Sequence, residues 1–327
     1  MAPQSASALQ HPRRSLGNRH LAQARKFLKL YNSSNPNNTQ NLAWAEQSAR
    51  QAVLYDFTNE DNWRLLVELK SLRSDKSGIY AVLEDLFTVL GRPPERLDSL
   101  KQTDLLEHGS ELLEAAFSID PLNPDTWWNT LTHDESKEKF STRMLSLDLR
   151  DPRANILFGR RIERFRSSQD EERFILLSTH LLSNRPTNHE AWTELGRLHE
   201  RRREFDDAWL CYDQAQSHFP ALTVRDEFRE RMTSSMDSKN KMWHAPDLVR
   251  REEFLARMES LARRLGEPVS EEEERVEIES KPDEKSELLQ LLESSEYQAA
   301  FFLARRIMAR GEDWAEEYLL RAKEGID

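Results

Sequence analysis

The sequence predicts an all-α protein built from stacked helical hairpins, and three observations favour this fold class. Residues 189–222 contain two stripes of apolar residues at helical spacing, joined by the polar turn 201–204. Pro152, Pro186 and Pro220 recur at equal intervals, with a period typical of helical-repeat arrays. Only nine glycines occur in 327 residues, and no glycine-rich loop follows a strand-like segment.

The two stripes predict which side chains pack between the paired helices. Gly196 and Ala208 are small enough to let the helix axes approach, while Trp192 and Tyr212 fill the space around them. Thr187, with Glu190 three residues later, forms a capping-box pattern that is expected to start the first helix. Pro220 is expected to end the second helix, since proline has no backbone N–H to donate. The predicted core consists of Trp192, Leu195, Gly196, Ala208, Tyr212, Ala215 and Pro220.

The spacing of these residues resembles the tetratricopeptide (TPR) repeat, a helix–turn–helix unit of about 34 residues. The resemblance covers about 70 residues well and residues 120–300 loosely. In the unit 155–188, Phe158 stands where the next unit has Trp192, and the step from Pro121 to Pro152 is shorter than the later ones. The resemblance implies a right-handed superhelix of TPR-like hairpins, a solenoid that binds other molecules rather than catalysing a reaction.

In TPR-like superhelices the first helix of each unit lines the concave face. The positions that the resemblance carries over to this sequence place Arg166, Thr193, Arg197 and Arg201 on that face, as candidate contacts to a partner protein or peptide. An alternative is that these arginines belong to ordinary exposed helix surface and pair with nearby glutamates, where each pair contributes little to stability.

Composition divides the chain into four segments. Residues 1–18 are rich in Ser, Ala, Gln and Pro and predict a disordered basic tail, and residues 19–264 predict the TPR-like α-solenoid. Residues 265–285 include the run Glu271–Glu274 and predict an acidic flexible linker, because they offer too little apolar surface to offset the entropy of ordering. Residues 286–327 then predict a C-terminal helical hairpin or repeat-like unit.

Charge is distributed unevenly along a chain whose formal net charge is −11. Residues 1–45 contain six arginines and lysines and no acid, and the remainder contains 41 basic against 58 acidic residues. The leading prediction is a cytoplasmic, non-catalytic scaffold or adaptor that binds a protein or peptide along its concave face. The alternative is an RNA-associated helical-repeat protein that uses the basic N-terminus and the arginines of residues 150–166 against phosphates. An acid-poor N-terminus is also typical of an organellar transit peptide, so organellar import stays open.

The sequence offers little that indicates catalysis. None of the nine histidines forms a pair with a cysteine at metal-binding spacing, and no HExxH motif occurs. No phosphate-binding glycine loop and no stretch of 18 consecutive apolar residues is present. The single cysteine, Cys211, excludes an internal disulfide and is expected to pack quietly on its helix. The sequence therefore predicts no enzyme, no cofactor, no metal site and no membrane span.

Overall fold

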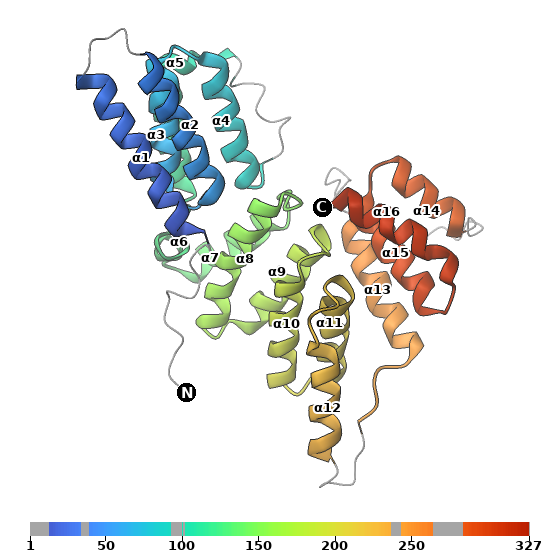
Figure 1. Ribbon diagram of the computed structural model, residues 1–327. Coiled ribbons are helices and arrows are strands. Elements are labelled where there is room, and N and C mark those ends of the chain that lie inside the picture. The colour runs from blue at the N-terminus through green and yellow to red at the C-terminus, as the bar shows by residue number, and fades with distance from the viewer. Residues whose placement is uncertain are drawn as a thin grey trace. The chain divides into compact units, whose positions relative to one another are not determined.

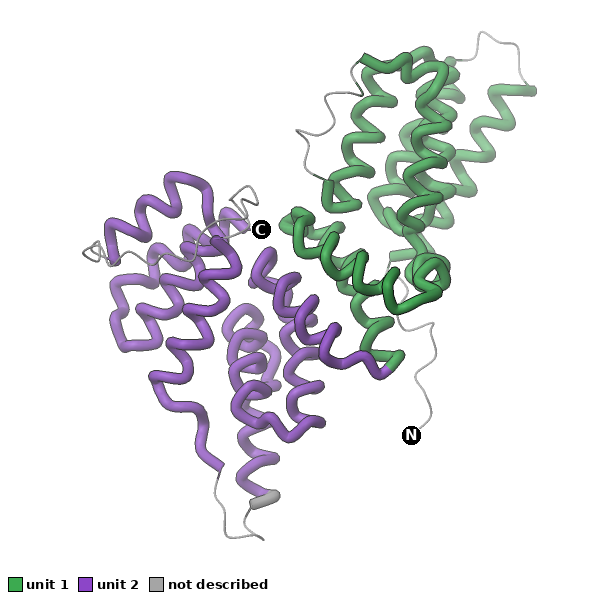
Figure 2. Tube along the Cα trace, turned by 180° about the vertical axis from the view of Figure 1, so that it is seen from behind, with its two compact units in different colours: residues 1–168 green, residues 169–327 purple. Residues whose placement is uncertain are grey.

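The computed structural model describes residues 13–33, 39–92, 100, 102–236, 243–263 and 284–326. Every regular element in these ranges is a helix, which confirms the predicted all-α class. The chain divides into two compact units, residues 1–168 and 169–327 (Figure 2). This division falls inside the predicted solenoid 19–264 and separates the two helices of the predicted repeat 155–188.

In the first unit the helices largely pack in sequence order. They are α1 (Arg14–Ser33), α2 (Thr39–Tyr55), α3 (Glu60–Leu72), α4 (Lys76–Val89), α5 (Leu105–Ile119), α6 (Pro124–Thr130), α7 (Asp134–Met144) and α8 (Pro152–Ser167). From α1 to α5, each helix contacts the one that follows it, and α8 contacts α4 and α6 (Figure 1). Nearest-neighbour packing of this kind is what stacked hairpins produce.

In the second unit the packing order changes partway along. The helices are α9 (Glu171–Asn184), α10 (His189–Arg201), α11 (Phe205–His218), α12 (Val224–Met236), α13 (Leu248–Arg263), α14 (Glu284–Glu293), α15 (Tyr297–Ala309) and α16 (Glu316–Ile326), with a short 3-10 helix at Asp313–Ala315. Helices α9 to α12 contact one another in sequence order, but α13 packs against α9 and α15. The C-terminal helices of residues 286–327 therefore belong to the same compact unit as residues 189–222.

The predicted segment boundaries differ from the described helices at two places. Helix α14 begins at Glu284, inside the predicted linker 265–285, and helix α1 begins at Arg14, inside the segment 1–18 that was expected to be disordered. Gly17 explains the extension, because it is buried and a Cβ there would lie 2.7 Å from the Cβ of Asp56. Residues 1–12 of the predicted tail and residues 265–283 of the predicted linker lie outside the described residues.

Asparagine side chains cap the N-termini of α3 and α10. The Asn59 carboxamide accepts a hydrogen bond from the backbone N–H of Asp61 at 3.1 Å, and Asn188 accepts one from Ala191 at 3.0 Å. These N-caps satisfy backbone donors at the start of α3 and α10. The predicted capping box at Thr187 is therefore wrong by one residue, and the Thr187 hydroxyl has no hydrogen-bond partner in the described part of the chain.

A tryptophan four residues after each of these caps fixes the incoming loop. The Trp63 indole N–H donates to the Phe57 carbonyl at 2.8 Å, and the Trp192 indole N–H donates to the Pro186 carbonyl at 2.8 Å. Both tryptophans are fully buried. Each hydrogen bond ties a buried ring to the backbone six residues earlier, and so sets the angle at which the chain enters the helix.

Two further helices vary this arrangement. Trp127 stands four residues after the cap Asn123 and is buried, but the carbonyl of Pro121 accepts its hydrogen bond from Arg161 Nη2, at 2.9 Å. In α8, the position four residues after the cap is Asn155, whose carboxamide N–H donates to the Leu149 carbonyl at 3.2 Å. The geometry thus recurs where the tryptophan is replaced.

The period of the prolines is visible in the backbone as well as in the sequence. Helices α8 and α10 end one such period apart, at Ser167 and Arg201. Gln169 and Arg203 are separated by the same interval and have φ of 65° and 63°, so the chain leaves both helices through a left-handed residue. Ser74 and Ser295 take the same conformation after α3 and α14, with φ of 52° and 63°.

The three periodic prolines do not share one structural position. Pro186 and Pro220 each lie two residues beyond the end of a helix. Pro152 instead occupies the first turn of α8, which a proline tolerates because its missing N–H would have no partner there. Pro152 therefore belongs to a helix start, and α8 is longer at its N-terminus than α10.

The predicted core of the best-matched repeat is buried, with one exception. Trp192, Leu195, Gly196, Ala208, Tyr212 and Ala215 are buried between their neighbours. A Cβ added at Gly196 would lie 2.8 Å from Tyr212 Cε1, so glycine allows the ring to lie against α10. Pro220 is exposed, because α11 has already ended at His218 and the proline lies in the following turn.

The role of Trp192 can be tested by truncation. We expect Trp192→Ala to lower the free energy of unfolding by about 3–5 kcal/mol, as a large core truncation. Trp192→Phe retains most of the apolar contact but loses the hydrogen bond to Pro186, and should cost clearly less. Urea unfolding of each variant measures both effects. Trp314→Ala is the control, since that side chain is 37% exposed. Equal stability of Trp192→Ala and the wild type would contradict the assigned packing.

Candidate functional site

The four predicted groove residues do not gather in one compact unit. Arg166 lies on α8 in the first unit, where its Nε donates to Glu163 at 2.7 Å. Thr193, Arg197 and Arg201 lie on α10 in the second unit. Thr193 is buried and its hydroxyl donates to the His189 carbonyl at 2.8 Å, so it does not face a ligand. This differs from the expectation for Thr193, because a threonine inside a helix can bond to the carbonyl one turn earlier.

Arg197 and Arg201 are both exposed on α10. Arg197 pairs with Glu194 at 2.5 Å, one turn away on the same helix. Arg201 forms no ion pair with any residue that the structure describes. Of the predicted cations, Arg201 is therefore the one whose charge is least compensated locally.

At least five of the six arginines of residues 150–166 pair with carboxylates of the first unit. Arg150 pairs with Asp148 at 2.6 Å, and Arg153 bridges Asp85 at 2.8 Å and Asp151 at 3.0 Å. Arg164 contacts Asp125 at 2.6 Å, and Arg161 is buried against Asp120 at 3.4 Å. This segment offers much less positive charge to a phosphate backbone than its composition suggests.

Helix α1 presents a second basic surface. It differs from residues 150–166 in that the helix itself contains no acidic residue. Arg14, Arg25 and Lys29 fall within about 60° of one another around the helix axis at 100° per residue. A groove of about 590 Å³ lies along this face, and Lys26, Lys29 and Asn18 are among its lining residues. Arg25 is paired across it with Asp61 at 2.9 Å, at the start of α3.

Next to the basic face runs a stripe of five exposed residues, which we call the α1 stripe. Its members are Leu16, Arg19, Gln23, Lys26 and Leu30. They follow one another at steps of three and four residues, the spacing of a heptad seam, over roughly 21 Å of helix at 1.5 Å per residue. Leu16 is 36% exposed and Leu30 is 41% exposed, so apolar side chains stand at both ends. Arg19 and Lys26 lie between them and form no ion pair with a described residue.

Helix α2 extends this surface sideways. A second groove, of about 380 Å³, lies between α1 and α2 and is lined by Gln23, Phe27, Trp44 and Gln47. The Trp44 ring is 42% exposed and lies 5.5 Å from the Phe27 ring. The α1 stripe thus borders an aromatic and amide-lined groove, a combination of apolar anchors and hydrogen-bonding groups.

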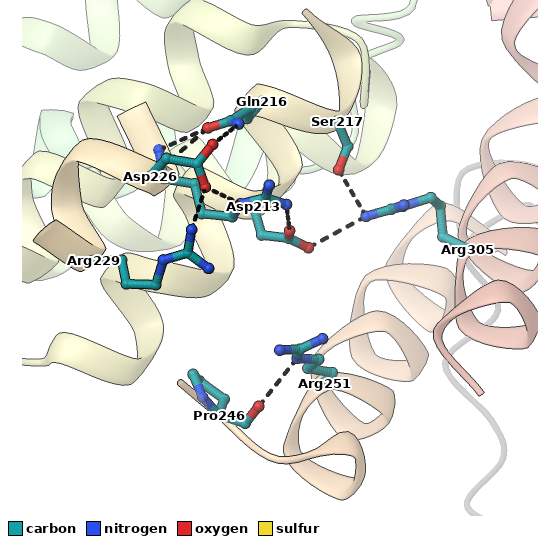
Figure 3. A network of polar contacts seen from close by, with 9 residues as sticks. Asp213, Gln216, Ser217, Asp226, Arg229, Pro246, Arg251 and Arg305 are labelled. Carbon is teal, nitrogen blue, oxygen red and sulfur yellow. Dashed lines mark hydrogen bonds and ion pairs between the residues drawn. The ribbon is translucent and has the colours of Figure 1, made fainter. Parts of the chain in front are cut away.

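A network of polar contacts in the second unit involves α11 and α15 (Figure 3). Arg305, on α15, points toward α11, where it contacts Asp213 at 3.3 Å and Ser217 at 3.0 Å. Arg225 pairs with the same aspartate at 2.7 Å. Burial and the nearby positive charge of Arg225 lower the pKa of Arg305, against the opposing effect of Asp213.

Neighbouring groups complete this network within the unit. The Gln216 carboxamide donates to Asp226 at 2.6 Å, and Arg229 contacts Asp226 at 3.3 Å. Arg251 donates to the Pro246 carbonyl at 3.1 Å (Figure 3). Since these groups bond to one another, the network serves to hold helices together rather than to receive a ligand.

Two other reactive side chains are also buried by packing. His218 stacks on Phe301 with ring centroids 4.8 Å apart. Burial, reinforced by the positive charges of Arg305 and Lys323, lowers the pKa of His218 to about 3. Cys211 is buried, and burial raises the pKa of its thiol, which disfavours a reactive thiolate.

Neither a metal cluster nor a membrane-spanning helix is found among the described residues. Within those ranges, no group of three or more His, Cys, Asp or Glu side chains is placed to hold a metal ion. No described helix combines the length and the apolar character that crossing a bilayer requires.

Comparison with known proteins adds no further assignment. No model of a known protein family matches the chain. No curated protein sequence matches it either.

The joint contribution of the two ion pairs of Asp213, with Arg225 and with Arg305, can be measured by neutralising this acid. Asp213→Asn preserves shape but removes the charge that faces Arg305, and we expect a loss of about 1.5–3 kcal/mol of unfolding free energy. Chemical denaturation at pH 7 measures this loss. Glu293→Gln, at an exposed position of the same unit, is the matched control and should leave stability unchanged. A similar stability for both variants would show that Arg305 needs no carboxylate.

The buried imidazole predicts how stability depends on pH. With a folded pKa of about 3 and an unfolded value of about 6.5, His218 binds protons only after unfolding at intermediate pH. The unfolding free energy is therefore highest well above pH 6.5, where His218 is neutral in both states. It decreases as the pH falls from 6.5 toward 3, because only the unfolded state binds the proton. At pH 5.5 this loss amounts to about 1.4 kcal/mol.

His218→Phe tests this dependence, since a phenyl ring keeps the stacking on Phe301 without titrating. The difference in unfolding free energy between pH 7.5 and pH 5.5 should be smaller in the variant than in the wild type. An identical difference in both proteins would place His218 in a more solvated position.

Proposed function

We propose that the chain is a non-catalytic scaffold of TPR-like helical hairpins that binds a partner protein through the α1 stripe. The recurrent Asn-cap and tryptophan geometry, together with the periodic spacing of helix ends, supports the TPR-like interpretation. The observation that carries the binding site is the exposed heptad-spaced sequence of apolar and basic residues on α1.

The chemistry of the stripe specifies the partner. Exposed leucines at both ends and Trp44 beside the stripe favour apolar anchors on the partner. Arg19 and Lys26 between the leucines favour acidic residues at its centre. An amphipathic helix with apolar residues about 21 Å apart and acidic residues between them meets both demands. This surface replaces the concave-face residues Arg166 and Thr193 as the leading site.

RNA binding is the second candidate, and the acid-free basic face of α1 is the observation that favours it. Two findings weigh toward a protein. At least five of the six arginines of residues 150–166 pair with acids of their own unit. Aliphatic side chains such as Leu16 and Leu30 contribute nothing to phosphate contacts, yet they define the ends of the stripe.

Affinity capture of the full chain, followed by quantitative mass spectrometry, tests the proposal with three variants. The charge variant is Arg19→Gln with Lys26→Gln, and the apolar variant is Leu16→Gln with Leu30→Gln. The control is Lys76→Gln with Lys139→Gln, which removes two exposed charges elsewhere in the same unit. Proteins captured by the wild type should include a set that neither stripe variant captures and that the control variant still captures. This result should be the same with and without ribonuclease treatment. Circular dichroism melting checks that each variant is folded.

The opposite outcomes identify RNA binding. Partners that disappear after ribonuclease treatment, or that depend on the charge variant but not on the apolar variant, would contradict a protein partner. Direct binding of single-stranded RNA that weakens steeply between about 50 and 200 mM salt would support the alternative.

A further inference from the structure

Three arginines converge on one buried aspartate in the first unit. Asp120 caps the C-terminus of α5 and is only 3% exposed. Arg143, on α7, donates to both of its carboxylate oxygens, at 2.6 and 3.2 Å. Arg161, on α8, contacts it at 3.4 Å, and Arg92, just after α4, approaches it to 3.6 Å. We call these four residues the Asp120 cluster.

The Asp120 cluster carries an excess of positive charge. Among the described residues, Asp120 is the one carboxylate paired with these three guanidinium groups, so in this part of the chain three positive charges face one negative charge. Burial and the neighbouring charge of Arg143 lower the pKa of Arg161 to about 10, against the opposing effect of Asp120. Elsewhere in this segment Arg150, Arg153 and Arg164 each have a carboxylate within 3.0 Å. The imbalance is therefore local to the cluster.

The three arginines differ in how much of each side chain is exposed to solvent, and therefore to a ligand. Arg161 is fully buried between the rings of Trp127 and Phe158, at 5.1 and 4.8 Å, and its Nη2 holds the Pro121 carbonyl. It is a structural member of the cluster. The side chains of Arg92 and Arg143 are 35% and 39% exposed.

Donors remain unused at this position. Arg143 Nε is buried without a hydrogen-bond partner, and Arg161 Nε is likewise unpartnered. Arg92 reaches Asp120 only at 3.6 Å, beyond hydrogen-bond distance. Its guanidinium group is positioned over the Phe87 ring, at 5.0 Å. Arg92 and Arg143 thus approach the same oxygen, Oδ2 of Asp120, at 3.6 and 3.2 Å.

We propose that Arg92 and Arg143 bind a phosphoryl group, either as inorganic phosphate or as the terminal phosphate of a phosphomonoester. Its charge at neutral pH, about −1.5 to −2, matches the excess of positive charge in this described part of the chain, whereas a second carboxylate would match only half of it. Guanidinium groups offer paired N–H donors that suit phosphate oxygens. Asp120 accepts two hydrogen bonds from Arg143, and Arg161 holds the Pro121 carbonyl next to Asp120. The site is independent of the α1 stripe and of any protein partner bound there.

Isothermal titration calorimetry of the full chain tests the site with sodium phosphate, and with phosphoserine against serine, at constant ionic strength. Arg92→Gln should reduce the affinity for the phosphoryl ligand at least about tenfold, since a charge-assisted hydrogen bond is lost. Because Arg92 makes no hydrogen bond to Asp120, this variant should fold normally. Arg50→Gln removes an exposed arginine of the same unit and should bind as the wild type does.

Each outcome decides the proposal. Binding of both phosphate and phosphoserine places the terminal phosphate at the site, and binding of phosphate alone identifies the free ion as the ligand. Binding of phosphoserine alone identifies a monoester. Absence of binding by either ligand overturns the proposal, as does equal binding by the wild type and Arg92→Gln. Arg143→Lys, which keeps the charge but loses the paired donors, should also weaken binding, and an unchanged affinity would overturn the role of Arg143.

Discussion

The hydrogen bond from a buried indole to a backbone carbonyl six residues earlier is the constraint on which the repeated helix packing depends. In α3 and α10 it closes the loop against the helix and holds the ring between neighbouring helices. The Trp192 ring lies 6.0 Å from the Phe254 ring of α13, so the same side chain also serves the packing of the C-terminal helices. A carbonyl left without this donor would be costly in a buried turn, which explains why Arg161 or Asn155 supplies one where the tryptophan does not.

Much of the local architecture could be predicted from the sequence, because helical periodicity and spacing are short-range properties. The all-α class, the pairing of α10 with α11 and the burial of Trp192 and Tyr212 follow from stripes within a single repeat unit. The predictions that were wrong also depend on short-range features of the sequence. Thr187 and Asn188 are both good N-cap residues, and only the backbone geometry selects Asn188. Pro152 lies in a first helical turn whereas Pro186 and Pro220 follow helix ends, so the period of the prolines alone does not define their structural position.

The candidate site was less predictable, because charge depends on partners that lie far away in the sequence. Arg153 meets Asp85, Arg164 meets Asp125 and Arg161 meets Asp120, separations that no short motif encodes. Density of arginine in the sequence therefore overstated the charge available to a ligand. The α1 stripe could have been recognised from five positions at heptad spacing in a segment without acidic residues. The sequence alone does not distinguish this pattern from an ordinary helix face, because it does not show that the five side chains are exposed.

The two proposed surfaces follow from one principle of charge compensation. In a chain with a net charge of −11, a cation finds an acidic neighbour unless the local structure keeps acids away. On α1 the sequence itself excludes acids, so the charge of Arg19 and Lys26 stays on an exposed face where acidic residues of a partner can pair with it. Around Asp120, in the part of the chain that the structure describes, packing supplies one carboxylate for three guanidinium groups, and Arg161 is fully buried among them. An exposed imbalance favours the acidic surface of a partner protein, whereas a half-buried one favours a small anion of matching charge.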